Sequence, residues 1–339
     1  MIRINQLSLP LGHPQEALRS AILERLQIKD ADLSGFTVFK RSYDARKKNS
    51  EIKFIYIIDA EVNNEDQVLA RFAGDQQIRI APDTDYHPVA EAPAGLTERP
   101  LVIGFGPCGL FAALILAQMG FKPIVLERGK EVRARTKDTW ALWRKKQLTP
   151  ESNVQFGEGG AGLFSDGKLY SQIKDPKFFG RKVMAEFVKA GAPEEIMYVS
   201  KPHIGTFRLT GVVSAMREEI KRLGGDVRFE SKVSEFIIHN GQTEGVVLAD
   251  GEKIMSRHVV LALGHSSRDT FRTLFKQGVH VEAKPFAIGF RVEHPQSLID
   301  KARLGKYAGH PDNLFPVQCR PQWRRWHYAR CANTATCRW

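Results

Sequence analysis

Three glycines in the first half of the chain have the spacing of a phosphate-binding loop. Gly104, Gly106 and Gly109 form a G-x-G-x-x-G pattern directly after the apolar residues 101–103. In this pattern the first glycine permits a tight turn, the second lets a pyrophosphate approach the backbone, and the third lets a helix pack closely on a strand. The apolar stretch 110–119 predicts that helix, whose free N–H groups would face the phosphates. The spacing therefore predicts a dinucleotide-binding loop.

An acidic residue follows where such a loop needs one. Glu127 lies 23 residues after Gly104, at the end of a second predicted strand, residues 122–126. A carboxylate there can accept hydrogen bonds from both ribose hydroxyls and favours a free 2′-hydroxyl. Arg128 beside it could instead bind a 2′-phosphate, so NADP stays open, or it could serve only packing.

A second glycine cluster helps to choose the cofactor. Five glycines occur within residues 157–167, so the backbone can come close to a ligand there as well. A nicotinamide enzyme gains little from a second loop, whereas a flavin dinucleotide is longer and has a ribityl chain to hold. The alternative interpretation is a flexible loop.

At this point seven motifs resemble one family, the bacterial FAD-dependent (NAD(FAD)-utilising) dehydrogenases of uncharacterised substrate. These are relatives of the glutathione-reductase-type flavoproteins. The resemblance runs from the N-terminus to about residue 312. It is carried by residues 104–109, 126–129, 153–162, 164–168, 202–206, 264–270 and 284–289.

The resemblance implies FAD as cofactor and an FAD-dependent oxidoreductase acting on a small-molecule substrate, with NAD(P) open as electron donor. It places the adenine half on the first loop and the flavin side on the second, where Asp166 would bind ribityl hydroxyls. The predicted cofactor-binding residues are Gly104, Gly106, Pro107, Cys108, Gly109, Glu127, Arg128, Gly159, Gly160, Ala161, Gly162, Ser165, Asp166, Val233 and Gly264.

The expected fold class is α/β. It combines a Rossmann-like FAD-binding domain with an N-terminal ferredoxin-like α+β domain, because residues 1–80 read as β-α-β-β-α-β. The resemblance further implies that the FAD-binding domain is of glutathione-reductase type and that it carries an inserted substrate region. The predicted parts are the N-terminal domain 1–80, a linker 81–99, the FAD-binding domain 100–167 and 223–270, an inserted substrate-side region 168–222, the start of a second substrate region 271–312, and an aberrant or disordered tail 313–339.

Local patterns make finer predictions. Asn64 is expected to cap a short helix. Residues 226–233 are expected to form one strand that lines the adenine, and residues 245–248 and 258–263 to belong to a β-meander.

No catalytic side chain is predicted, because a flavin carries its own redox chemistry. Cys108 is expected to be a small packing residue near the phosphates, since it has no partner at Cys-x-x-Cys spacing. His203 and His265 are interpreted as structural, with anion or substrate binding as the alternative.

The last 27 residues differ in kind. Residues 313–339 hold three of the four cysteines, three of the five tryptophans, five arginines and no acid. We interpret them as the product of a shifted reading frame, and the chain as a fragment with weak or absent FAD retention whose activity stays open. The cysteine spacings match no usual metal pair, so no metal is expected.

Composition and charge bear on whether the protein could be a membrane protein or a secreted one. The 339 residues carry a net charge of +12, which falls to +7 without the tail. The uncharged run 101–121 favours strand, turn and helix over a membrane span, because its glycines would interrupt a spanning helix. Few cysteines and no signal layout indicate the cytoplasm.

Two alternative functions remain. One is an NAD(P)-dependent dehydrogenase that uses the single Rossmann site. The other is a nucleic-acid-binding protein that uses the basic loop 44–50. We expect no nucleic-acid partner, because no aromatic stacking pattern accompanies those charges.

Overall fold

The computed structural model describes residues 1–45, 51–164, 167–169, 173–285 and 295–310. The chain separates into two compact units. The amino-terminal unit holds Met1–Asp83, Met197–Pro202 and the described residues from position 285 on. The pocket unit holds Thr84–Ile196 and His203–Lys284. Among the described residues, no helix has both the length and the apolar character needed to cross a bilayer.

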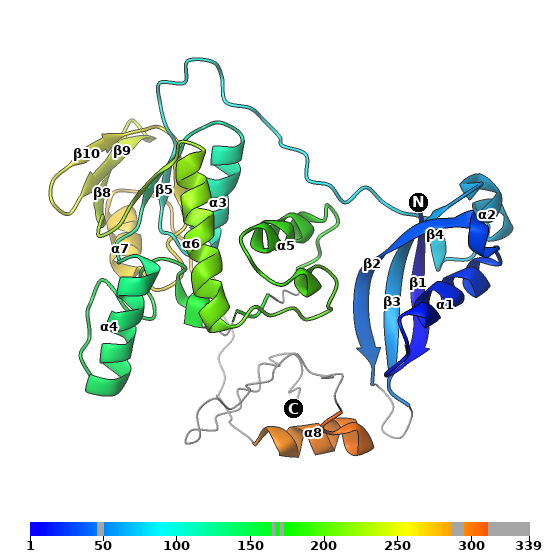
Figure 1. Cartoon of the computed structure of the whole chain (residues 1–339). Helices are drawn as coiled ribbons and strands as arrows, with labels where there is room; N and C mark the ends of the chain where they lie inside the picture. The colour runs from blue at the N-terminus through cyan, green and yellow to red at the C-terminus, as the bar shows by residue number, and fades with distance from the viewer. Residues whose placement is uncertain (46–50, 165–166, 170–172, 286–294, 311–339) are drawn as a thin grey trace. The chain divides into compact units, whose positions relative to one another are not determined.

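The amino-terminal unit is ferredoxin-like, as predicted. Its four strands form an antiparallel sheet in the order β2-β3-β1-β4, and two helices connect them (Figure 1). The elements are β1 (Ile2–Pro10), α1 (Glu16–Leu26), η1 (Asp30–Asp32), β2 (Leu33–Asp44), β3 (Lys53–Val62), α2 (Glu65–Arg71) and β4 (Ile78–Ile80), with α8 (Gln296–Leu304) and η4 (Gly305–Tyr307) later in the chain.

Alternation along the strands explains this unit's core. Ile2 and Ile4 of β1 and Ile58 of β3 are fully buried, because alternate side chains of a strand point to the same face. They pack with the apolar stripe of α1, which contributes Ile22 and Leu26. Burying five large aliphatic side chains of this kind stabilises by about 1.5–3 kcal/mol each.

The pocket unit is built around a parallel sheet in the order β11-β5-β6-β7, joined by an antiparallel meander in the order β10-β9-β8. This sheet, with a glycine loop between its β5 strand and the next helix, is the predicted Rossmann-like fold. The elements are β5 (Leu101–Ile103), α3 (Pro107–Gln118), β6 (Ile124–Leu126), α4 (Val132–Lys145), η2 (Ala161–Phe164), α5 (Phe179–Lys189), η3 (Glu194–Met197), α6 (Thr206–Arg222), β7 (Asp226–Arg228), β8 (Val233–His239), β9 (Gln242–Leu248), β10 (Lys253–Met255), β11 (Val259–Leu261) and α7 (Arg268–Lys276).

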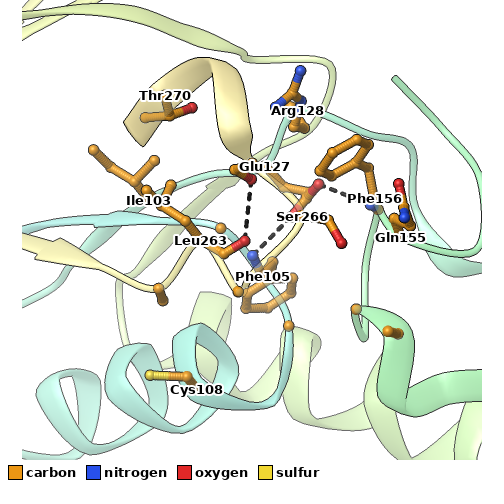
Figure 2. A pocket seen from close by; sticks show the side chains of 18 of the residues that line it. Ile103, Phe105, Cys108, Glu127, Arg128, Gln155, Phe156, Leu263, Ser266 and Thr270 are labelled. Carbon is orange, nitrogen blue, oxygen red and sulfur yellow. Dashed lines mark hydrogen bonds between the residues drawn. The ribbon is translucent and has the colours of Figure 1, made fainter. Parts of the chain in front are cut away.

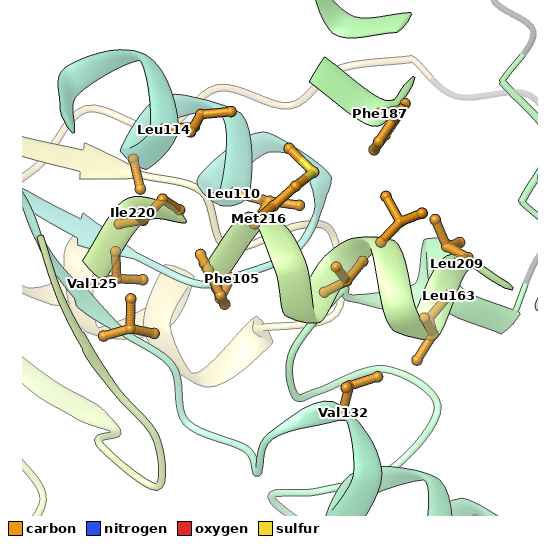
Figure 3. Packing of buried hydrophobic residues seen from close by; sticks show 14 of the residues in the cluster. Phe105, Leu110, Leu114, Val125, Val132, Leu163, Phe187, Leu209, Met216 and Ile220 are labelled. Atoms are coloured by element: carbon orange, nitrogen blue, oxygen red, sulfur yellow. The ribbon is translucent and has the colours of Figure 1, made fainter. Parts of the chain in front are cut away.

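Both faces of the parallel sheet are covered, which is why its strands are short apolar runs. Val125 of β6 faces the layer of α3 and α6, where it packs with Leu114 and Ile220 (Figure 3). Leu101 and Ile103 of β5 face the opposite layer, formed by the meander and α7. The sheet is thereby fixed between two apolar layers, and the loops at its strand ends are held in place.

Three local expectations were wrong. Residues 226–233 divide into β7 and the start of β8, because Glu230 between them has a left-handed backbone (φ 54°). The stretch 258–263 pairs as β11 with β5 in the parallel sheet and not with the meander. Asn64 stands at the amino end of α2 but adopts φ 56° and makes no side-chain cap hydrogen bond.

Candidate functional site

A pocket opens at the carboxyl ends of β5, β6 and β11, where the loops that follow these strands converge (Figure 2). Its cavity is about 220 Å³. Ligands of doubly wound α/β proteins bind at this edge of the sheet. The lining residues come from the loop after β5 (103–108), the end of β6 (126–128), the second glycine loop (155–157 and 160–162), the start of β8 (231–233) and the segment after β11 (262–267 and 270).

The three glycines of the first loop have different surroundings. A Cβ on Gly109 would lie 1.9 Å from the carbonyl oxygen of Gly104, so α3 can pack this closely only with glycine there. A Cβ on Gly106 would lie 3.6 Å from the Cα of Gly160, an ordinary contact distance. Gly106 is also the N-cap of α3, with φ −74°. The third glycine is therefore needed by the fold, whereas the second keeps the pocket open.

Glu127 ties three loops together. It is 4% exposed. Its Oε2 accepts a hydrogen bond from the N–H of Phe105 at 2.7 Å (Figure 2). Its Oε1 accepts hydrogen bonds from the N–H groups of Gly129 and Gly157, both at 2.9 Å. A carboxylate has about four acceptor positions, so one position on Oε2 stays available toward the pocket it lines.

Arg128 is engaged by two carboxylates. Its Nη1 and Nη2 donate to the two carboxylate oxygens of Asp269 at 3.0 and 2.8 Å, and its Nε donates to Glu151 at 2.5 Å. Its guanidinium also lies 4.2 Å from the ring centre of Phe156. The hydrogen bond from Arg128 is the main reason that the pKa of Asp269 lies well below its ordinary value.

Lys232 completes this ion network. Its Nζ lies 2.9 Å from Glu151 and 3.1 Å from Asp269. The network thus contains two cations and two anions, so Arg128 does not present an unbalanced positive charge to the pocket.

The second glycine loop is held from behind by Arg135 of α4, whose side chain is fully buried. Its guanidinium donates to backbone carbonyl oxygens of the loop. Burial lowers the pKa of Arg135 to about 10, although Glu127 and Glu158 favour its charged form. Glu158 is fully buried as well, and burial raises the pKa of its carboxyl group.

The structure brings most of the predicted residues together. Gly109 and Gly159 are not among the lining residues, and Ser165 and Asp166 lie outside the described residues. The predicted residues that line the pocket are Gly104, Gly106, Pro107, Cys108, Glu127, Arg128, Gly160, Ala161, Gly162, Val233 and Gly264.

Cys108 differs from the expectation of a packing residue, because it is exposed at the start of α3. His265 lines the pocket, whereas His203 forms an isolated bridge with Lys168 away from it. No sequence pattern predicted a role for Lys232, Asp269, Arg135 or Glu151. Asp269 alone lies within one of the motifs, residues 264–270, but nothing local in the sequence indicates its pairing with Arg128.

The described residues contain no cluster of three or more His, Cys, Asp or Glu side chains suited to a metal. The tail cysteines and most of the basic loop 44–50 lie outside the described part of the chain.

Comparisons with solved structures give distant likenesses. The chain is similar to THI4 of Thermovibrio ammonificans (18% identity, 53% of this chain, 62% of that chain, TM-score 0.34). It is also similar to glycine oxidase of Bacillus cereus (14% identity, 54% of this chain, 60% of that chain, TM-score 0.34). A third likeness is to L-amino acid deaminase of Proteus vulgaris (16% identity, 55% of this chain, 59% of that chain, TM-score 0.34). The fold assignment therefore rests on the sheet order and the place of the glycine loop.

Sequence comparison finds close likeness to proteins without an assigned activity. Residues 1–61 match the model of a domain of unknown function, DUF8436. The chain is 45% identical over 310 residues to an uncharacterized protein of Clostridium beijerinckii, a match that covers 91% of this chain. The chain spans 57% of the length of that relative.

Proposed function

We propose that the pocket binds the adenosine diphosphate half of FAD, and that the protein is an FAD-dependent oxidoreductase acting on a small molecule. One observation carries this proposal. Gly106 at the amino end of α3 and Gly160 of the second glycine loop lie in direct backbone contact, since a Cβ added to Gly160 would come within 2.8 Å of the Cα of Gly106. Both glycines line the pocket, and the carboxylate of Glu127 borders it as well.

The residues present fit such a ligand. The first turn of α3 has N–H groups without intrahelical acceptors and the positive end of the helix dipole, both of which favour phosphate. Glu127 would accept a ribose hydroxyl at its remaining Oε2 position. A cavity of about 220 Å³ is smaller than the roughly 300–1,000 Å³ of whole small-molecule sites, which suits one half of a dinucleotide.

When bound, the flavin would supply hydride transfer, and the protein would supply binding and orientation. Under this proposal Gly106 and Gly160 admit the pyrophosphate, Glu127 orients the ribose, and Val233 lines the adenine side. NAD(P)H is proposed as electron donor. No acid or base from the described residues is required.

A competition titration tests the proposal. We expect one FAD per chain to bind saturably but with the weak affinity predicted from the sequence, with a shift of the visible flavin band. ADP should compete for the site, because it carries the adenine half, and FMN should not. Binding of NAD without binding of FAD would favour the alternative, an NAD-dependent dehydrogenase, since both ligands share the adenosine diphosphate half.

A further inference from the structure

A single buried cation organises the second glycine loop. Arg135 donates from Nε to the carbonyl oxygen of Asn153 at 2.8 Å and from Nη2 to that of Val154 at 2.8 Å. Its Nη1 donates to the carbonyl oxygens of Gly157 at 3.2 Å and Glu158 at 2.6 Å. Four carbonyl groups within six residues thus point at one guanidinium. No carboxylate oxygen is among its hydrogen-bond acceptors in the described part of the chain.

Glu127 holds the same loop through the other backbone polar group of Gly157. The N–H of Gly157 donates to Glu127 Oε1 at 2.9 Å, while the carbonyl oxygen of Gly157 accepts from Arg135. Gly157 has φ 115°, and a Cβ on it would lie 2.4 Å from the Cδ of Arg135. The loop backbone is therefore shaped around this arginine.

The hydrogen bonds to Arg135 decide on which side of the loop its carbonyl groups lie. Gln155, Phe156 and Gly157 line the pocket, whereas Arg135 does not. The carbonyl oxygens that bind Arg135 are consequently held behind the loop. A carbonyl oxygen turned toward a pyrophosphate would place negative partial charge beside negative charge.

We propose that Arg135 is a positioning residue for the ligand, which keeps the second glycine loop's carbonyl groups away from the bound pyrophosphate. This inference rests on the proposed function, because it assumes an anionic dinucleotide in the pocket. Arg135 would act on the ligand only through the carbonyl dipoles that it holds, without touching the ligand itself.

The charged groups around Arg135 set its pH behaviour. Glu127 at the end of β6 and Glu158 of the loop both favour its charged form. Glu158 Oε2 is in turn bound by Arg217 of α6 at 2.8 Å and by the N–H of Val132, while its Oε1 has no partner among the described residues. Arginine stays charged in this site at neutral pH, but a lysine would not be protected in the same way, because burial lowers the pKa of an ammonium group.

The test therefore compares three variants by FAD titration across pH. Arg135→Met removes the charge, and FAD binding should weaken at least about tenfold at every pH, the effect of roughly 1.4 kcal/mol. Arg135→Lys keeps the charge near about pH 6 but offers three donors to four carbonyl groups, so FAD should bind more weakly than to wild type there and more weakly still toward about pH 9, as the buried ammonium deprotonates. Arg133→Met, on the exposed face of the same helix, is the matched control and should leave affinity unchanged.

A ligand-free readout separates this inference from the proposed function. Amide hydrogen exchange of residues 153–160 should speed up at least about tenfold in Arg135→Met without ligand, if Arg135 fixes the loop. FAD binding by Arg135→Met equal to wild type, or a flat pH profile for Arg135→Lys, would overturn the positioning role alone. Absence of FAD binding by wild type would overturn the proposed function, and with it the claim that the fixed loop serves a ligand.

Discussion

The two units bury different kinds of side chain. In the amino-terminal unit the described core is almost wholly apolar, and Arg3 is its single buried charged residue. The pocket unit buries four charged residues, Glu127, Arg135, Glu158 and Glu186, together with several hydroxyl and amide side chains. Burying polar groups costs free energy unless hydrogen bonds replace those to water. Glu127 and Arg135 bind the backbone of the glycine loops, which indicates that these loops are held for a purpose other than stability.

The buried charged residues of the two units also differ in their hydrogen-bond partners. Arg3 pairs with a side chain, Asp59, in a bidentate contact at 2.7 and 2.8 Å. Glu127 and Arg135 instead bind backbone N–H and carbonyl groups of loops. The amino-terminal unit uses Arg3 to join two strands, while the pocket unit uses Glu127 and Arg135 to set loop conformation.

The largest effect is expected for Gly109→Val. Its Cβ would meet backbone atoms that cannot move aside, so we expect the pocket unit to lose at least about 3 kcal/mol of stability and to lose FAD binding. Circular dichroism and hydrogen exchange measure both. Gly211→Ala in α6, where an added Cβ meets nothing within 4 Å, is the control and should be neutral or slightly stabilising. Wild-type stability of Gly109→Val would contradict the packing described for α3.

Arg3→Met tests the other unit. It leaves the carboxylate of Asp59, 13% exposed, without its partner. We expect the free energy of unfolding of the amino-terminal unit to fall by about 2 kcal/mol, with no change in FAD affinity. Arg79→Met, on an exposed position of β4, serves as control. A loss of FAD affinity in Arg3→Met would break the separation of roles between the units.

Asp269→Asn gives a smaller, pH-dependent effect. Because the folded-state pKa of Asp269 is lowered, its ion pair stabilises above the unfolded-state pKa of about 3.9 and is lost as pH falls toward the folded-state pKa. Asp269 is 45% exposed, so solvent screening limits the loss at pH 7 to about 1 kcal/mol. Urea unfolding should show the difference from wild type shrinking below about pH 4. A difference that grows in acid would refute this account of the network.

Cys108→Ser should have the smallest effect. Cys108 is exposed at the mouth of the pocket, so we expect the free energy of unfolding to change by less than about 0.5 kcal/mol. FAD affinity should stay within about twofold by titration. A larger loss of affinity would mean that the thiol itself contacts the ligand.

The fold was accessible from sequence where the signal is local. The β-α-β-β-α-β order and the glycine loop each follow from periodicity and spacing within short windows. The strand 258–263 was placed in the wrong sheet because three apolar residues do not specify which strand they pair with. The roles of Arg135 and Asp269 could not be predicted either. Their hydrogen-bond partners lie 18 or more residues away in the chain, and no sequence pattern links the partners to them.

The most direct test of the central claim is a flavin-fluorescence titration of wild type, Gly106→Val and Gly211→Ala with FAD. The backbone of Gly106 admits a side chain without left-handed strain, and the valine of Gly106→Val should occupy the space proposed for the pyrophosphate. Circular dichroism checks that the variant is folded before its FAD binding is compared. We predict saturable, one-to-one quenching for wild type and Gly211→Ala, and at least tenfold weaker binding for Gly106→Val, roughly 1.4 kcal/mol. Equal FAD binding by a folded Gly106→Val, or no binding by wild type, would contradict the account.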